Sequence, residues 1–237
     1  MRIIQNEFIK NKTIITYIID FLVPIITCAL LKYLVIDFSA EYSDLTPSTY
    51  WYVSFSMIYL LMILPIQIVY QNLRESLIED NNSGWEMMQQ MNVKISKVVR
   101  VKFLINLIRC FIVYITYILI CLLILNERDF VSLIHLIILP SIWSCIMFLP
   151  VAILLQMICL NFDSITMKMV PSIIVILVNL ITFHTDINLL LPNTYYFTII
   201  QENYYLFLKL IITLILLVLE LSLFPNYLEL KKRENYL

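Results

Sequence analysis

Long apolar runs, separated by short polar segments, make up most of this sequence. A membrane-spanning helix needs about 20 mostly apolar residues, and six runs approach or exceed this length, none with the alternating pattern of a barrel strand. We therefore predict an all-α, polytopic membrane protein with a single transmembrane domain over residues 1–237. Pro140 and Pro150 are expected to bend the fourth run or to separate a short piece from it. The six predicted spans are residues 14–36, 51–71, 103–125, 132–160, 170–183 and 205–224.

Lysine and arginine are distributed unevenly among the segments between these spans. Twelve of them lie in segments on one side, whereas the segments on the other side contain only Arg128. Because cytoplasmic segments carry the excess of positive residues, we predict a multi-pass protein of the cell membrane with both termini in the cytoplasm. The twelve cytoplasmic residues are Arg2, Lys10, Lys12, Arg74, Lys94, Lys97, Arg100, Lys102, Lys168, Lys231, Lys232 and Arg233.

The composition narrows the possible functions. Hydrophobic residues make up 61% of the chain, charged residues make up 14%, and there is one glycine. A P-loop needs two glycines and a dinucleotide-binding fingerprint needs three, so the chain contains neither motif. The formal net charge of −1 provides no basic surface for nucleic acid. These features exclude ATP hydrolysis through a P-loop and argue against nucleic-acid binding.

The sequence offers no candidate catalytic or metal-binding site. His135 and His184 do not lie at metal-ligand spacing, and a serine nucleophile elbow needs glycines that the chain lacks. The five cysteines all lie within the predicted spans, where we expect them to be small, buried hydrophobic side chains. We therefore predict no catalytic residue, metal or cofactor for this chain.

Five charged residues lie inside the predicted spans, where an isolated charge is costly. Lys32 and Lys209 lie near the outer ends of spans one and six and are expected to reach the membrane surface. Asp20, Arg109 and Glu220 lie at a common level, about 8–10 Å from the cytoplasmic edge. Their signs predict an ion pair or network between spans one, three and six. Independent contact with the membrane surface and contact with a substrate are the alternatives.

The segment between spans two and three, residues 72–102, is the most informative cytoplasmic part of the sequence. Residues 81–84 (Asn-Asn-Ser-Gly) favour turns and helix caps, and a helix over 84–91 is expected to follow, with Glu86 in its first turn. An apolar stripe on so short a helix either lies on the membrane surface or fills a groove on a cytoplasmic partner. The stripe consists of Trp85, Met88 and Met91.

The order of these parts resembles the permease subunits of ABC exporters of the type-2 class. Permeases of that class have an amphipathic elbow helix at the N-terminus, six spans, both ends in the cytoplasm and a coupling helix between spans two and three. The corresponding segments here are 1–12 for the elbow helix, 84–91 for the coupling helix and 184–204 for a re-entrant segment outside the cell. The resemblance of architecture covers nearly the whole chain.

Within that class, the short chain resembles the lantibiotic-immunity permeases of Gram-positive bacteria. Those proteins often show an acidic residue, a tryptophan, a stretch that begins with proline and a lysine before span three. This chain has Glu79, Trp85 and Lys102 in the same order. Asn92 stands where that family usually has proline, so the motif is matched in part.

The resemblance implies a function and a set of partners. Such a permease is not an enzyme and takes no cofactor itself, because a cytoplasmic ATPase subunit binds ATP and magnesium. The chain would pair with a second six-span permease, identical or homologous, within the membrane lipid, and would expel an antimicrobial peptide. Export of a drug, a glycan or a toxin peptide, intramembrane peptide processing, and a non-transporting scaffold are the alternatives. The implied ATPase-coupling residues are Glu79, Gly84, Trp85, Glu86, Met88 and Met91.

Overall fold

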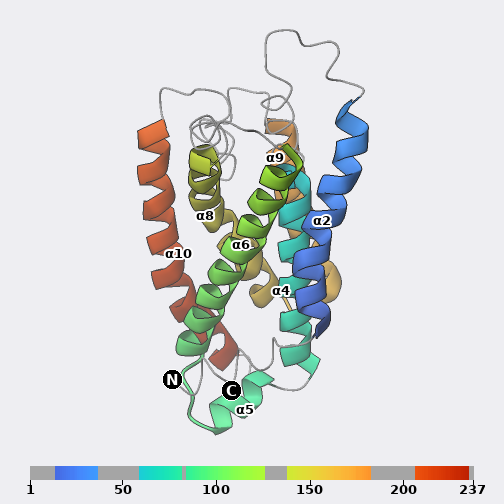
Figure 1. Ribbon diagram of the computed structural model, residues 1–237. Coiled ribbons are helices and arrows are strands. Elements are labelled where there is room, and N and C mark those ends of the chain that lie inside the picture. The colour runs from blue at the N-terminus through green and yellow to red at the C-terminus, as the bar shows by residue number, and fades with distance from the viewer. Residues whose placement is uncertain (1–13, 37–58, 82–83, 126–137, 183–205, 235–237) are drawn as a thin grey trace.

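The computed structural model describes residues 14–36, 59–81, 84–125, 138–182 and 206–234 (Figure 1). Within these ranges the chain is helical and has no β-strand, which confirms the predicted all-α fold class. The elements are α2 (Ile14–Ile36), a π-helical turn η1 (Tyr59–Ile63), α4 (Leu64–Asn81), α5 (Gly84–Gln90), α6 (Ile95–Leu125), α8 (Leu139–Asn161), α9 (Ile165–Thr182) and α10 (Leu206–Glu234).

Three of these helices contain a stretch that is long and apolar enough to cross a membrane. The stretches are Ile95–Leu123 in α6, Ile142–Asn161 in α8 and Phe207–Lys232 in α10. Shorter apolar helical stretches lie at Ile18–Leu30 and Ile165–Val178. By length and composition the chain is therefore compatible with a membrane protein. The predicted elbow helix and the predicted re-entrant segment lie outside the described residues.

The helix ends follow local sequence signals. The helix α2 has the bounds of the first predicted span, and α6 begins at Ile95, where the chain leaves the turn after α5. The beginning of the fourth predicted span, up to residue 137, lies outside the described residues, so the expected bend at Pro140 is not tested. Pro140 lies in the first turn of α8, where its missing N–H costs no hydrogen bond. Pro150 lies inside α8, which continues past it to Asn161.

Successive long helices run in opposite directions along the bundle (Figure 1). The helix α4 packs against α8 and α9, and α6 packs against α2, α8 and α10. The short helix α5 lies across one end of the bundle, and α2 begins and α10 ends toward this same end. We call it the α5 end.

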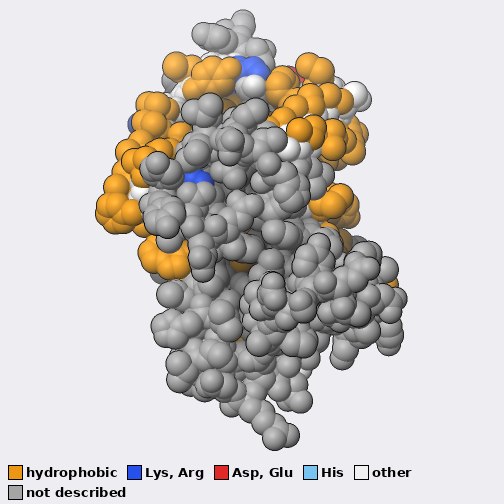
Figure 2. All heavy atoms as spheres, turned by 90° about the horizontal axis from the view of Figure 1, so that it is seen from above, with side chains coloured by type: hydrophobic (Ala, Val, Ile, Leu, Met, Phe, Trp, Pro, Cys, Tyr) orange, Lys and Arg blue, Asp and Glu red, His pale blue; other side chains and the backbone are white. Residues whose placement is uncertain are grey.

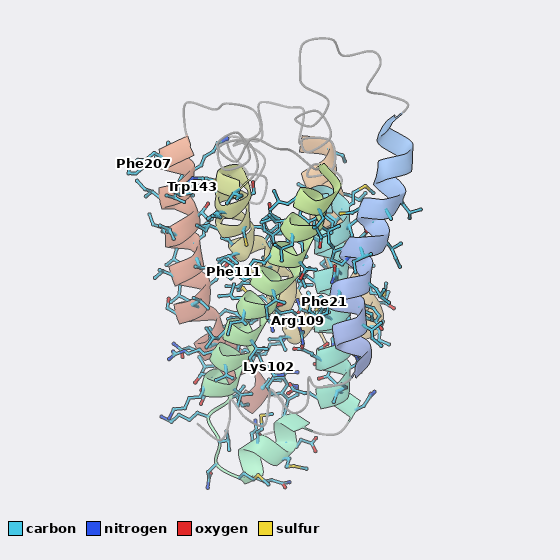
Figure 3. The ribbon with its side chains drawn as sticks, viewed as in Figure 1. Phe21, Lys102, Arg109, Phe111, Trp143 and Phe207 are labelled. Carbon is cyan, nitrogen blue, oxygen red and sulfur yellow. The ribbon has the colours of Figure 1, made fainter. Side chains whose placement is uncertain are left out.

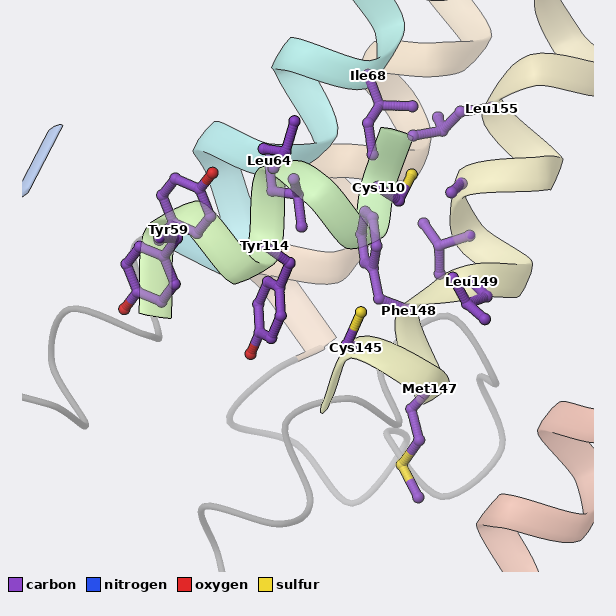
Figure 4. Packing of buried hydrophobic residues seen from close by; sticks show 14 of the residues in the cluster. Tyr59, Leu64, Ile68, Cys110, Tyr114, Cys145, Met147, Phe148, Leu149 and Leu155 are labelled. Carbon is purple, nitrogen blue, oxygen red and sulfur yellow. The ribbon is translucent and has the colours of Figure 1, made fainter. Parts of the chain in front are cut away.

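A buried apolar core joins η1, α4, α6 and α8 (Figure 4). The rings of Tyr59 and Tyr117 stack with their centroids 4.1 Å apart, and Tyr114 lies beside them. Leu64 of α4 and Phe148 of α8 are buried in the same core. All five cysteines are buried free thiols, which confirms the prediction that they serve as small hydrophobic side chains.

The outward sides of the helices carry many large apolar side chains. Seen from the end opposite α5, hydrophobic side chains line much of the outer edge of the described helices (Figure 2). Leu123 of α6 is 83% exposed and Phe207 of α10 is 74% exposed. Soluble monomers rarely expose large contiguous apolar patches, so membrane hydrocarbon is the solvent that this surface fits.

Candidate functional site

The helix α4 carries two polar stripes that face the other helices. Residues spaced by four lie on one side of a helix, and each stripe repeats at this interval. Most of these side chains are buried, although several are charged. Through these stripes α4 makes polar contacts with α2, α5, α6 and α9. The first consists of Gln67, Gln71, Glu75 and Glu79, and the second of Asn72, Ser76 and Asp80.

Arg109 of α6 connects three helices through two carboxylates (Figure 3). Its Nη1 lies 2.5 Å from Oε1 of Glu75 on α4, and its Nε lies 3.6 Å from Oδ2 of Asp20 on α2. Oδ1 of Asp20 accepts hydrogen bonds from Nε2 of Gln71 and, at 3.5 Å, from Nε2 of Gln67. We call these five residues the Arg109 cluster. The structure thus brings together Asp20 and Arg109, as the sequence suggested.

Glu220 does not join this cluster. It lies on α10, and its Oε2 has no hydrogen-bond partner among the described residues. Glu75 takes the place that we expected Glu220 to occupy. The second predicted span ends at residue 71, but the repeat Gln67, Gln71, Glu75 continues in the same helix and is the sequence signal for this contact. Lys209, in the first turn of α10, has a buried side chain.

Two further ion pairs bind α4 to α6 and α9. Nζ of Lys102 on α6 lies 2.8 Å from Oε1 of Glu79. Lys168 of α9 pairs with Asp80, and its Nζ also donates a hydrogen bond of 3.1 Å to Oγ of Ser76. As an implied coupling residue, Glu79 is expected to be available to a partner protein. This expectation is wrong, because Glu79 is buried and its carboxylate faces Lys102 of its own chain.

Trp85 fixes α5 to the bundle. Its side chain is only 2% exposed and packs with Ile95 and Phe103 of α6 and with Leu228 of α10. Its Nε1 donates a hydrogen bond of 3.1 Å to Oδ1 of Asp80. The expectation that Trp85 lies on an exposed stripe is therefore wrong. The apolar side of α5 is covered by α6 and α10, which pack against each other at this end of the bundle.

Two methionines are exposed in this segment, Met87 of α5 and Met91 in the turn directly after it. Met88 is half-buried and packs against the same core as Trp85. Met87 is 53% exposed and Met91 is 67% exposed, and they lie four residues apart. Glu86 is exposed as well. Among the predicted coupling residues, Glu86 and Met91 therefore remain available to a partner, and Met87 joins them.

Two turn residues set where α5 begins and ends. A Cβ at Gly84 would lie 3.2 Å from the carbonyl oxygen of Glu79, so glycine allows α5 to start close against the end of α4. Asn92 has a φ of 54° and lies in the turn where the amides of Asn92 and Val93 close back on the helix. Proline is fixed near −65° and cannot adopt this angle. A proline at position 92 would therefore not fit this turn.

The last turns of α10 hold α5 from the other side. The backbone oxygen of Lys232 accepts a hydrogen bond of 3.2 Å from Nε2 of Gln89, and its Nζ lies 5.8 Å from the centre of the Trp85 ring. The same Nζ lies 2.7 Å from Oδ1 of Asp163 in the turn between α8 and α9. The hydrogen bond from Lys232 lowers the pKa of Asp163 from its ordinary value. The position of α5 is thus linked to α4, α6, α10 and the α8–α9 turn.

The described residues contain no group of His, Cys, Asp and Glu side chains that would hold a metal ion. Comparison with protein-family models, with curated proteins and with solved structures found no match to this chain. Function is therefore inferred from the arrangement of the described residues and from the order of segments along the sequence.

Proposed function

We propose that this chain is the transmembrane permease subunit of an ATP-driven exporter of the ABC type-2 class. In this proposal it spans the membrane six times, its termini lie in the cytoplasm, and a partner subunit hydrolyses ATP. The observation that carries the proposal is α5, a short helix at the end of an apolar bundle. It buries one side and exposes Met87 on the other, together with Met91 in the turn directly after the helix. A helix that exposes adjacent apolar side chains in water fits a groove on a second protein.

The attachments of α5 suit a helix that transmits force. Trp85 connects it to α6 and α10, and the hydrogen bond from Trp85 to Asp80 connects it to α4. Closure of the ATPase subunits would displace α5, and these contacts would pass the displacement to the spans. The two bases next to the α8–α9 turn, Lys231 and Lys232, extend the same connection to α8 and α9.

The proposed substrate is an amphipathic antimicrobial peptide, and the proposed role is self-immunity in a Gram-positive bacterium. The order of Glu79, Trp85 and Lys102 along a short chain supports this assignment, as in the immunity permeases that the sequence resembles. A second permease, identical or homologous, would complete the path through the membrane.

Co-purification from the native host tests the proposal. The tagged full chain is expected to retain an ATPase subunit. The double variant Met87→Gln and Met91→Gln is expected to lose at least about tenfold of it, since a hot-spot residue of an interface costs about 2 kcal/mol or more when it is replaced and about 1.4 kcal/mol is a tenfold change in affinity. Met167→Gln changes an exposed methionine of α9 and serves as the matched control. Retention of the ATPase by the double variant would rule out this face as the docking surface.

The same strains test the substrate. Strains with the double variant are expected to be as sensitive to the exported peptide as strains without the gene, whereas the control strain keeps its tolerance. Equal tolerance of all strains to a panel of amphipathic peptide antibiotics would contradict the immunity assignment.

A further inference from the structure

The Arg109 cluster contains more negative than positive charge. Asp20 and Glu75 are both carboxylates and both face the single guanidinium of Arg109, while Gln67 and Gln71 are neutral. With both acids ionised the cluster has a net charge of −1. The side chains of Asp20, Glu75 and Arg109 are 7%, 13% and 11% exposed, so little solvent reaches this charge.

The neighbouring groups do not balance the excess. The pairs Glu79–Lys102 and Asp80–Lys168 each join one acid to one base and are neutral. Arg74, the other cation of α4, makes no ion pair with either carboxylate among the described contacts. Within the described part of the chain, the other titratable side chains that interact electrostatically with the cluster are a phenol and two thiols, which are uncharged at neutral pH. They are Tyr59, Cys110 and Cys159.

The cluster lies at a level where the bundle exposes apolar side chains. On α2, Phe21 and Leu22 follow Asp20 directly and are each 45% exposed. On α6, Ile108 and Phe111 flank Arg109 and are exposed as well. Figure 3 shows Phe21 close to the level of Arg109 along the bundle. In a membrane this surface meets hydrocarbon, where an unbalanced charge is costly and no counter-ion is available.

We propose that the Arg109 cluster is a binding site for one proton, which Asp20 and Glu75 share. Transfer of a proton from water to either carboxylate turns that group into a neutral carboxylic acid, and the net charge of the cluster changes from −1 to zero. The other carboxylate keeps its ion pair with Arg109. The charge count supports this proton site whether or not the chain is a transporter.

A proton fits this site better than an alkali metal ion. The guanidinium of Arg109 lies against both carboxylates, and the amide Nε2 atoms of Gln67 and Gln71 point at Asp20. A metal cation would have to replace these donors with several oxygen ligands, whereas a proton needs one lone pair. Loss of the proton would place a net charge between α2 and α4, so the docking of α2 is coupled to proton binding.

Infrared spectroscopy of the full chain in lipid nanodiscs tests the proposal directly. A protonated carboxyl group gives a C=O stretching band that is separate from the carboxylate bands and shifts in D₂O. All spectra are recorded on a chain that carries Glu220→Gln, which serves as the background. This removes Glu220, a further acid within the apolar part of the bundle that could give a band of its own. At neutral pH this background is expected to show the band, and to lose it as the pH is raised.

The charge count predicts a specific response to substitution. Either Asp20→Asn or Glu75→Gln alone removes the excess charge, so each is expected to abolish the band. Asp163→Asn removes an exposed acid in the α8–α9 turn and is expected to leave the band unchanged. If one variant does not fold, the other provides the same test.

Three results would overturn the proposal. The first is a background spectrum without the band at neutral pH, and the second is a band that survives both single substitutions. The third is a band that disappears at fixed pH as sodium or potassium is raised, which would show that the cluster takes a metal cation instead.

Discussion

Replacing Arg109 by glutamate is expected to prevent the chain from accumulating as a folded protein. The change would put a third acid beside Asp20 and Glu75 and remove the only cation of the cluster. Breaking a buried ion pair costs about 3–5 kcal/mol, and the whole stability of a domain is about 5–15 kcal/mol. The amount of monodisperse protein extracted from membranes, followed with a fluorescent tag, measures the effect.

Two comparisons separate electrostatics from other effects of this substitution. Arg100→Glu changes a solvent-exposed arginine that contacts Asn226 at 3.3 Å, and it is expected to leave expression near the wild-type level. A triple variant with Asp20→Asn, Glu75→Gln and Arg109→Gln removes every charge of the cluster and is expected to recover most of the folded protein. Normal accumulation of the Arg109→Glu variant would show that the cluster does not hold α2, α4 and α6 together.

Replacing Trp85 by alanine is expected to detach α5 from the bundle while the apolar helices still assemble. The indole is buried among Ile95, Phe103 and Leu228, and truncating a buried aromatic side chain costs about 3–5 kcal/mol. The substitution also leaves Oδ1 of Asp80 without its indole donor. Hydrogen–deuterium exchange over residues 84–92 is expected to rise strongly, and retention of the ATPase is expected to fall with it.

The matched control is Met91→Ala, which truncates a side chain that is mostly exposed. This variant is expected to leave exchange over 84–92 unchanged, because little packing is lost. Unchanged exchange in the Trp85→Ala variant would show that α5 is held by its turns alone, without the indole.

The elements of the fold follow closely from local sequence signals. The apolar runs predicted helices that the structure describes as α2, α6, α8, α9 and α10, and residues 81–84 marked the break before α5. These features depend on residues that are neighbours in sequence, and so a pattern of apolar and turn-forming residues is sufficient to predict them. The second predicted span ends at residue 71, whereas α4 continues to Asn81, because the polar stripes of α4 look like the end of a span although they continue inside the bundle.

The site was predicted less well, because it depends on how the helices rotate about their axes. The similar depth of Asp20 and Arg109 was enough to predict their contact. Depth alone does not say which face of α10 turns inward, and Glu220 was assigned a place that Glu75 occupies. The apolar stripe of α5 was recognised, but a stripe does not reveal whether the chain itself or a partner covers it. The packing of α6 and α10 against Trp85 decides that the chain itself covers the stripe, and this packing is a tertiary feature.

Cross-linking from the exposed face of α5 tests the central claim most directly. A Met91→Cys variant in inverted membrane vesicles is treated with a short reagent that joins a thiol to an amine, with Met167→Cys as the control. The account predicts an adduct between this chain and a nucleotide-binding subunit at position 91, with a yield that changes when ATP is added, and none at position 167. A cysteine at position 91 that reacts with a soluble maleimide but gives no such adduct would contradict the account.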